Sequence, residues 1–201
     1  SIGDTSEYRL LPQLIKNISY LAPGVDVESY LTPRTETPKE LAAGNIDFAI
    51  DPPIHSDPNL RNEKIYQDDY VLVVNKKHPI AKKKKISLED YLNLSHIHIS
   101  KRASGLGHVD TTLNRLGLTR RITLRAQHFL VAPYIIDQSN LAMTTIKSFS
   151  RGRELKVFQL PFKINPLVLH LYWHVNKDMD PANKWMRELI LNTYGKIQGK
   201  R

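Results

Sequence analysis

Patterns typical of helices and of strands alternate along nearly the whole of this 201-residue chain. An apolar face at helical spacing is formed by Leu11, Leu14, Ile15, Ile18 and Leu21, whereas Val25 to Leu31 and Ile46 to Ile50 are typical of strands. A helix between successive strands is typical of βαβ units, whose parallel strands bring the loops that follow them to one edge of a sheet. The order of elements therefore predicts an α/β fold with ligand-binding loops along that edge.

The same alternation begins again after the apolar strand predicted at Tyr70 to Val74. Ser87 and Asp90 have the spacing of a helix capping box. Further strands are predicted at residues 96–100, 122–126, 141–146, 155–160 and 167–175, and helices at 37–44, 109–116 and 129–136 and after Asp180-Pro181. Residues 54–69, by contrast, form a polar stretch without a clear pattern.

Two similar α/β halves joined by two long strands predict a molecule with two lobes and a cleft at the crossover strands. We expect subdomain I to comprise residues 1–77 plus 170–201. Subdomain II, residues 78–169, would then be inserted within subdomain I. The chain begins almost directly with a loop and a helix, so we expect the native sequence to continue upstream.

Composition argues against several classes of protein. No window approaches the roughly 18 uninterrupted apolar residues of a membrane span, and the first residues lack the pattern of a signal peptide. The eight histidines lack the spacing of metal ligands, since His170 and His174 in one strand would lie about 13 Å apart. We therefore expect no membrane contact, no metal and no cofactor. The absence of cysteine is consistent with the cytoplasm, where we place the protein.

The formal net charge of +9 leaves two interpretations open. A basic chain can contact nucleic acid or an anionic ligand, but positive charge also simply maintains solubility. The densest run, Lys82 to Lys85, is typical of a solvated loop. No Gly-x-Ser-x-Gly turn, Walker loop or nucleophile–base pair is present, so we expect no enzymatic activity.

Small polar side chains recur after the predicted strands, and this is the feature that points to ligand binding. They are Thr5 and Ser6 in an expected strand-to-helix loop, Thr32, Ser100, Arg102 and Ser104, with His128 at the start of a helix. Hydroxyls and helix N-termini suit the capture of a carboxylate, and a cationic side chain adds charge-assisted hydrogen bonds. Phe129 or Trp173 would supply an apolar wall. Each of these residues alone also has a simpler interpretation, as a cap, a turn former or a core residue.

Several short motifs occur in an order that resembles the effector-binding domain of LysR-type transcriptional regulators. They are Leu-Pro-Gln-Leu at 11–14, Ala-Pro-Gly-Val at 22–25, residues 41–50, His78-Pro79, and Trp173 with Asp180-Pro181 and Trp185. Residues 107–110, 116–118 and 171–174 and His128-Phe129 are similar to the branch that regulates nodulation and naphthalene or nitroaromatic catabolism. The resemblance implies two Rossmann-like subdomains of the periplasmic-binding-protein type II-like fold, with an effector between them.

The resemblance also implies roles for individual residues. Thr5 and Ser6 match the first pocket loop, Pro52 lies in the loop after the third strand, Ser104 matches the loop of the second lobe, and His128 matches a histidine that faces the effector. The family forms homodimers that pair into tetramers. It binds DNA through an N-terminal winged helix-turn-helix that this chain does not contain, so we expect DNA contact only through that missing domain.

The leading hypothesis is therefore a regulatory domain that binds a small anionic or aromatic effector and alters DNA binding by the full-length oligomer. A periplasmic-type solute-binding protein of a transport system would use the same two-lobed layout and is the first alternative. A nucleic-acid-binding module that relies on Lys82 to Lys85 is the second. An upstream helix-turn-helix would favour the regulator, and an upstream signal peptide would favour the transporter.

Overall fold

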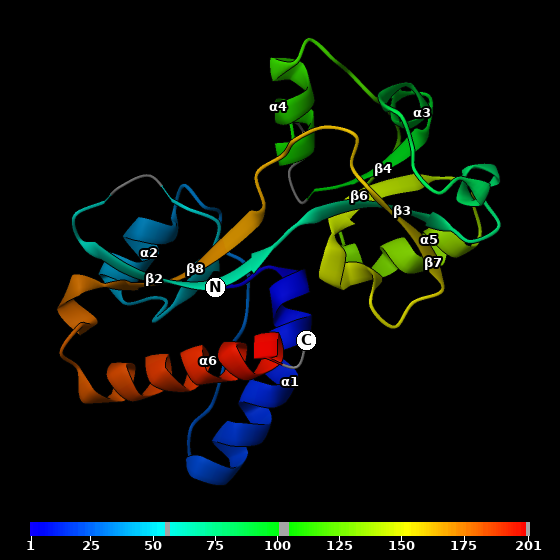
Figure 1. The fold of residues 1–201 in the computed structure, drawn as a ribbon. Helices are drawn as coiled ribbons and strands as arrows, with labels where there is room; N and C mark the ends of the chain where they lie inside the picture. The colour runs from blue at the N-terminus through cyan, green and yellow to red at the C-terminus, as the bar shows by residue number, and fades with distance from the viewer. Residues whose placement is uncertain (55–56, 101–104, 200–201) are drawn as a thin grey trace. The chain divides into compact units, whose positions relative to one another are not determined.

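The computed structural model of the protein describes residues 1–54, 57–100 and 105–199. The chain forms two compact units, unit 1 from Ser1–Gln67 with Val168–Arg201 and unit 2 from Asp68–Leu167. Each unit has its own β-sheet and helices (Figure 1). The α/β class that the alternating patterns predict is confirmed.

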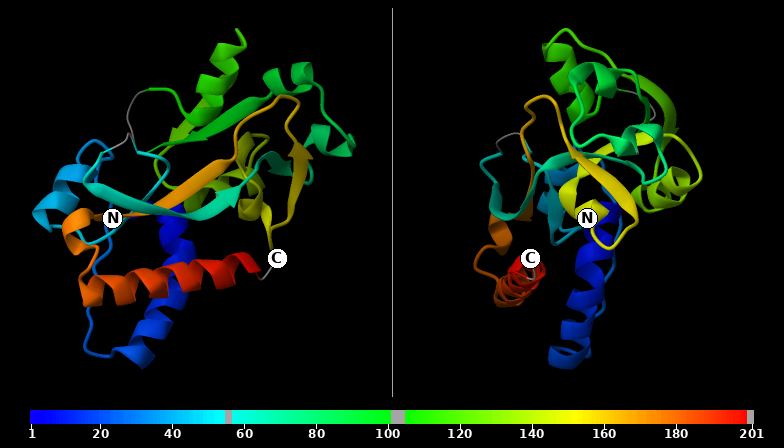
Figure 2. Two further views of the ribbon diagram at one scale, coloured as in Figure 1. Left: turned by 60° about the vertical axis from the view of Figure 1, so that its left-hand side comes forward. Right: turned by 45° about the vertical axis from the view of Figure 1, so that its right-hand side comes forward.

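Unit 1 is built on a three-stranded sheet with the strand order β1–β8–β2. Its elements are α1 (Asp4–Leu21), α2 (Thr37–Ala43), β1 (Ala49–Asp51), β2 (Leu60–Asp68), β8 (Leu167–His174), the 3-10 helix η4 (Val175–Lys177) and α6 (Pro181–Gly199). β8 runs antiparallel to β1, with Leu171 opposite Ile50. Helices α1 and α6 pack against each other and cross, as Figure 2 shows, and Asn17 Nδ2 donates a hydrogen bond to Thr193 Oγ1 over 3.2 Å at this contact.

Helix α1 begins earlier than its hydrophobic pattern predicts. The residues expected to form a loop before it, Asp4 to Ser6, form its first turn, and Gly3 is the N-cap. Leu10, Leu14 and Ile18 are buried, so the predicted face is confirmed at Leu14 and Ile18, whereas Ile15 and Leu21 are exposed and Leu10 is buried in place of Leu11. The predicted element is thus confirmed, but Thr5 and Ser6 lie in a helix and not in a loop.

One strand prediction in unit 1 is wrong, and one strand of unit 1 was not predicted. The segment from Val25 to Leu31 forms no regular strand, although the Tyr30 carbonyl accepts a hydrogen bond from Ile2 N–H. Alternating apolar residues form a strand only where a sheet covers one face, and Val25, Val27 and Leu31 are exposed here. Conversely, β2 occupies part of the polar stretch 54–69, since it is an edge strand whose first half is largely exposed.

Unit 2 contains a five-stranded mixed sheet with the order β5–β4–β6–β3–β7. Its strands are β3 (Tyr70–Asn75), β4 (Ser95–Ile99), β5 (Arg121–Ala126), β6 (Ala142–Ile146) and β7 (Leu155–Gln159). Its helices are η1 (Pro79–Lys82), α3 (Leu88–Leu92), α4 (His108–Arg115), η2 (Phe129–Val131), α5 (Ala132–Asp137) and η3 (Lys147–Ser150). β4 is parallel to β5 and β6, whereas β3 is antiparallel to β6 and β7 and so belongs to unit 2.

The predicted capping box at Ser87 and Asp90 is confirmed at the start of α3. The Asp90 N–H donates to Ser87 Oγ, and the Ser87 N–H donates to Asp90 Oδ2, both over 3.0 Å. This reciprocal pair satisfies two backbone donors that the first turn of a helix otherwise leaves free. Tyr91, on the buried side of α3, then packs into the core of unit 2 with Leu72 and Leu113.

His96 of β4 is a fully buried histidine in this core. Its Nε2 lies 2.9 Å from the Tyr91 carbonyl, and its ring lies 4.7 Å from that of Tyr91. Burial, and next the positive charge of Arg120, lower the pKa of His96 from 6.5 to about 4. His96 is therefore neutral in the folded protein at physiological pH.

The core of unit 1 predicts a large effect for Leu171→Ala. Leu171 is fully buried in the central strand β8. We expect its truncation to lower the free energy of unfolding by about 2–5 kcal/mol, because it removes apolar contacts and leaves a cavity. Urea denaturation measures this loss. The matched control, Leu21→Ala at the exposed end of α1, should change stability by less than about 0.5 kcal/mol.

The neutral state of His96 predicts a dependence of stability on pH. The unfolded chain takes up a proton at His96 below about pH 6.5, whereas the folded chain does so only near pH 4, so stability falls as pH drops between these values. We expect a loss of up to roughly 3 kcal/mol over this range. Urea denaturation across this range should show a shallower decline for His96→Gln. An equally shallow decline for the control His108→Gln, at an exposed site, would contradict this assignment.

Candidate functional site

The loop edge of unit 1 lies where β1 ends and α1 begins. The Ile50 N–H donates to the Ser1 carbonyl, and the Thr32 N–H donates to Ser1 Oγ, both over 2.9 Å. These bonds connect the start of the chain with β1 and with the segment that precedes α2. They bring together the segments that carry Thr5, Thr32 and Pro52, three of the predicted site residues.

The two predicted residues of α1 differ in their surroundings. Thr5 is half-buried, and its N–H donates to Asp4 Oδ1 over 3.1 Å. Ser6 is buried, and its side chain lies at Tyr194 of α6. Thr5 is thus at the helix N-terminus with a partly accessible surface, whereas Ser6 faces the interior of unit 1.

An arginine and a carboxylate that the sequence analysis did not single out lie beside Pro52. Arg34 Nη2 donates to the carbonyls of Pro52 and Pro53 over 3.2 and 2.5 Å, and Arg34 Nε lies 3.7 Å from Asp51 Oδ1. Burial raises the pKa of Asp51 to about 6, although the nearby charge of Arg34 opposes this shift. The edge thus combines a half-exposed cation with a carboxyl group that exchanges a proton near neutral pH.

His170 and Tyr172 add an aromatic part to this edge. The register of β8 places His170 opposite Asp51, and the His170 ring stacks on Tyr172 with 5.9 Å between centroids. Tyr172 Oη accepts a hydrogen bond from Ile54 N–H over 2.9 Å, which holds the loop after β1. Polar residues at strand ends are a signal that could have identified Asp51, but His170 and Tyr172 become recognisable only once the pairing of β8 with β1 is known.

Trp173 lies in a different environment from these two residues. Side chains alternate along a strand, so Trp173 belongs to the opposite face of β8 from Tyr172. Its Nε1 donates to Asp178 Oδ1 over 2.8 Å, and the Arg187 guanidinium lies 4.4 Å from its ring. Trp173 is 8% exposed and packs against Arg187 of α6, on the face of β8 opposite Tyr172.

The loop edge of unit 2 lies at the carboxyl ends of the parallel strands β4 and β5. The Ser100 N–H donates to the Ala126 carbonyl over 2.9 Å, which aligns the two ends. His128 follows β5 by two residues and is the exposed N-cap of η2. Phe129 packs edge-on against Phe149, with 6.0 Å between ring centroids. Ser100, His128 and Phe129 therefore share one edge of unit 2, as the sequence predicts for loops after parallel strands.

The remaining predicted residues, Arg102 and Ser104, lie outside the described residues. The chain on either side of residues 101–104 is held by a buried ionic cluster. His98 Nδ1 of β4 lies 3.3 Å from Asp110 Oδ2 in the first turn of α4, and Arg120 Nε donates to Asp110 Oδ1 over 2.7 Å. Burial raises the pKa of Asp110, but the hydrogen bonds from His98 and Arg120 outweigh it and leave this pKa well below its ordinary value.

Gly107, the N-cap of α4, packs directly against this cluster. A Cβ atom at Gly107 would lie 2.5 Å from Cε1 of His98, so a larger residue requires the buried ring to move. The end of β4 and the start of α4 therefore have a fixed separation. The absence of a side chain at this position is a packing requirement and not only a feature of a turn.

Metal-ligand clusters and membrane-spanning helices are two other kinds of functional feature that the described residues could contain. Among the residues that the structure describes, no three His, Cys, Asp or Glu side chains are grouped so that they could hold a metal ion. None of the described helices is long and apolar enough to cross a membrane.

Comparison with known proteins adds information about the whole chain. The family model described as the LysR substrate binding domain matches residues 1–195. Among curated relatives, the HTH-type transcriptional activator NagR of a Ralstonia species is 27% identical over 199 residues, which cover 96% of this chain and 65% of NagR. The chain thus spans slightly less than two thirds of the length of this relative.

Solved structures have the same fold. A putative transcriptional regulator from Vibrio parahaemolyticus superposes with a TM-score of 0.83 at 24% identity, covering 98% of this chain and 94% of that one. The effector binding domain of QuiR in complex with shikimate superposes with a TM-score of 0.73 at 19% identity, covering 97% and 95% of the two chains. The predicted fold, two Rossmann-like subdomains of the periplasmic-binding-protein type II-like class, is confirmed. With the family model matching almost its full length, the chain belongs to the LysR substrate binding domain family.

Proposed function

We propose that this chain is the effector-sensing domain of a LysR-type DNA-binding transcriptional regulator and that it binds a small anionic or aromatic ligand. The family match over residues 1–195 is the observation that carries this proposal. Ligand binding would shift the population of conformations by its differential affinity for them and so alter how the full-length oligomer holds DNA. The position of the ligand between the two subdomains remains a prediction.

The polar loop edges supply the chemistry for an anionic ligand. In unit 1, Arg34 is half-exposed and is held by two backbone carbonyls, which fix its guanidinium beside the end of β1. In unit 2, Ser100 and His128 lie at adjacent strand ends. Charge-assisted hydrogen bonds from such groups, together with predicted Arg102, suit a carboxylate. The shikimate complex of QuiR supports a small carboxylate as the ligand class.

The proposal includes the partners and location of the whole protein. We expect DNA contact through an N-terminal winged helix-turn-helix, assembly as a homodimer or tetramer, and a cytoplasmic location. Exposed apolar residues on α1, among them Tyr8, Ile15 and Tyr20, support self-association. We expect no catalysis and no cofactor. The family match does not favour the solute-binding alternative or the nucleic-acid-binding alternative.

The role of His128 can be tested by calorimetry with benzoate, salicylate and shikimate. If His128 donates a hydrogen bond to the ligand carboxylate, His128→Ala should weaken binding of any hit by about tenfold or more, since hydrogen bonds to charged groups are worth about 1.5–3 kcal/mol. His108→Ala, another exposed histidine of unit 2, is the matched control. Unchanged affinity in the His128 variant would argue against this role.

Asp51 predicts a pH dependence of the same binding reaction. Its carboxyl group loses a proton as pH rises through about 6, and the new negative charge disfavours an anionic ligand nearby. Affinity for a carboxylate ligand should therefore fall as pH rises through this value. Asp51→Asn should reduce this fall, whereas Asp137→Asn, at an exposed position in unit 2, should retain it. Identical pH profiles for the Asp51 variant and the parent protein would exclude this contribution.

A further inference from the structure

The positive charge of the chain is concentrated in unit 2. Residues 68–167 contain 17 Lys and Arg side chains against 7 Asp and Glu, which gives this unit a net charge of +10. Unit 1 contains the other 12 basic and 13 acidic side chains, which give it a net charge of −1. Charge that served only solubility would need no such separation, whereas a strong charge asymmetry between two parts of a chain is typical of proteins that contact nucleic acid or membranes.

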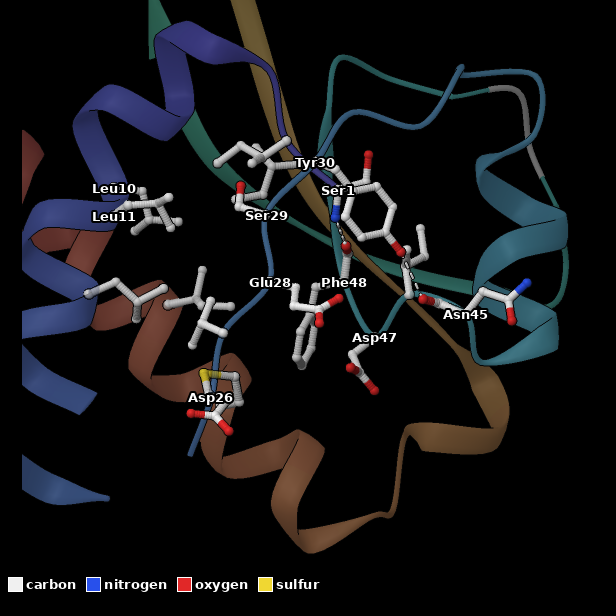
Figure 3. A pocket seen from close by; sticks show the side chains of 17 residues that line it. Ser1, Leu10, Leu11, Asp26, Glu28, Ser29, Tyr30, Asn45, Asp47 and Phe48 are labelled. Carbon is white, nitrogen blue, oxygen red and sulfur yellow. Dashed lines mark hydrogen bonds between the residues drawn. The ribbon is translucent and has the colours of Figure 1, made fainter. Parts of the chain in front are cut away.

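Unit 1, by contrast, carries carboxylates that would repel a polyanion. Figure 3 shows Asp26, Glu28 and Asp47 within one region of this unit. Like charges disfavour contact wherever such groups meet phosphates or other anions. Contact of this chain with a polyanion is therefore expected at unit 2.

The densest basic segment of unit 2 lies between β3 and α3. Its six lysines, Lys76, Lys77 and Lys82 to Lys85, are all exposed. Lys76 pairs with Glu154, and Lys83 pairs with Asp90. None of the salt bridges formed by the described residues involves the other four lysines. The segment therefore presents several cations whose charge no neighbouring carboxylate neutralises.

The backbone that carries Lys82 to Lys85 is held at both ends. Before the run, the Ile80 N–H donates to His78 Nδ1 over 3.1 Å at the start of η1. After the run, Ile86 is buried in the core of unit 2, and the capping box then starts α3. These lysines therefore extend from an ordered piece of chain, so binding costs less conformational entropy than it would for a disordered basic tail.

The side-chain types of this segment suit the phosphate backbone of a DNA duplex. Lys contacts phosphates as a point charge, whereas Arg, which recognises planar groups bidentately, is absent from residues 76–90. These residues also contain no Phe, Trp or Tyr on which the bases of a single strand could stack. None of the exposed large apolar side chains lies among them, although segments that bind at a membrane surface usually insert such side chains.

We propose that residues 76–85 form a surface by which the effector domain itself holds the phosphate backbone of double-stranded DNA. This inference rests on the proposed function, because a DNA-binding regulator keeps a duplex close to its effector domain. The contact would be independent of base sequence. Recognition of a particular sequence would remain with the predicted winged helix-turn-helix.

The proposal is tested by fluorescence anisotropy of the 201-residue chain with a labelled DNA duplex of arbitrary sequence, at low salt and without effector. The duplex should bind, and a single strand of the same length should bind more weakly. Each phosphate contact lowers the slope of log affinity against log salt by about 0.9. With three or four contacts, a tenfold rise in salt concentration should weaken binding about a thousandfold.

Two triple variants locate the binding surface. Lys82→Gln, Lys84→Gln and Lys85→Gln in one chain should weaken duplex binding about tenfold or more and make the salt dependence shallower, since up to three phosphate contacts are lost. Arg115→Gln, Arg121→Gln and Arg125→Gln in one chain make the same charge change at exposed positions of α4 and β5. This control should weaken binding less than about threefold, because distant exposed charges are screened.

Three outcomes would overturn the proposal. Absence of duplex binding at low salt would show that the lysines only solubilise the domain. Equal losses in the two triple variants would show a dependence on net charge and not on this surface. Tighter binding of poly-glutamate or of anionic lipid vesicles than of the duplex would assign the lysines to an acidic polypeptide or a membrane. None of these results would affect effector sensing, which the calorimetric titrations test separately.

Discussion

The antiparallel pairing of β8 with β1 joins two parts of unit 1 that lie far apart in sequence. Its register sets Leu171 opposite Ile50 and His170 opposite Asp51. Because side chains alternate along a strand, a shift of one residue would exchange the two faces of β8. Leu171 and Tyr172, which are both buried but lie on opposite faces of β8, would then exchange faces and lose their packing partners. One backbone register therefore determines both the stability of unit 1 and the chemistry of its loop edge.

Much of the fold can be predicted from the sequence, because many signals are local. The capping box of Ser87 and Asp90 acts within one turn, and the apolar spacing of Leu14 and Ile18 needs only the helix itself. Strands depend on their neighbours and are less predictable. β2 forms at a sheet edge despite its polar sequence, and Val25 to Leu31 remains outside the sheet despite its alternation, because pairing partners and not the segment itself decide these cases.

The same contrast between local sequence signals and contacts of distant segments applies to the candidate site. The rule that polar residues follow parallel strands predicts Thr5, Thr32, Ser100 and His128, and the structure places these residues at the loop edges of their own units. Arg34 was not predicted, because its position depends on contacts with Pro52, Pro53 and Asp51 that no sequence pattern reveals. Trp173 is a residue type that is common in ligand pockets. It lies, however, on the face of β8 that packs against Arg187 of α6.

The close approach of Gly107 to His98 means that different residues of one stretch of chain maintain the fold and contact the proposed ligand. The ionic cluster of His98, Asp110 and Arg120 fixes where β4 ends and where α4 starts, whatever residues connect them. The connecting residues 101–104 include Arg102 and Ser104, which would determine the ligand specificity of the proposed site. Relatives could therefore diversify these four positions, and with them the compound they detect, while the supporting frame and its folding energy remain the same.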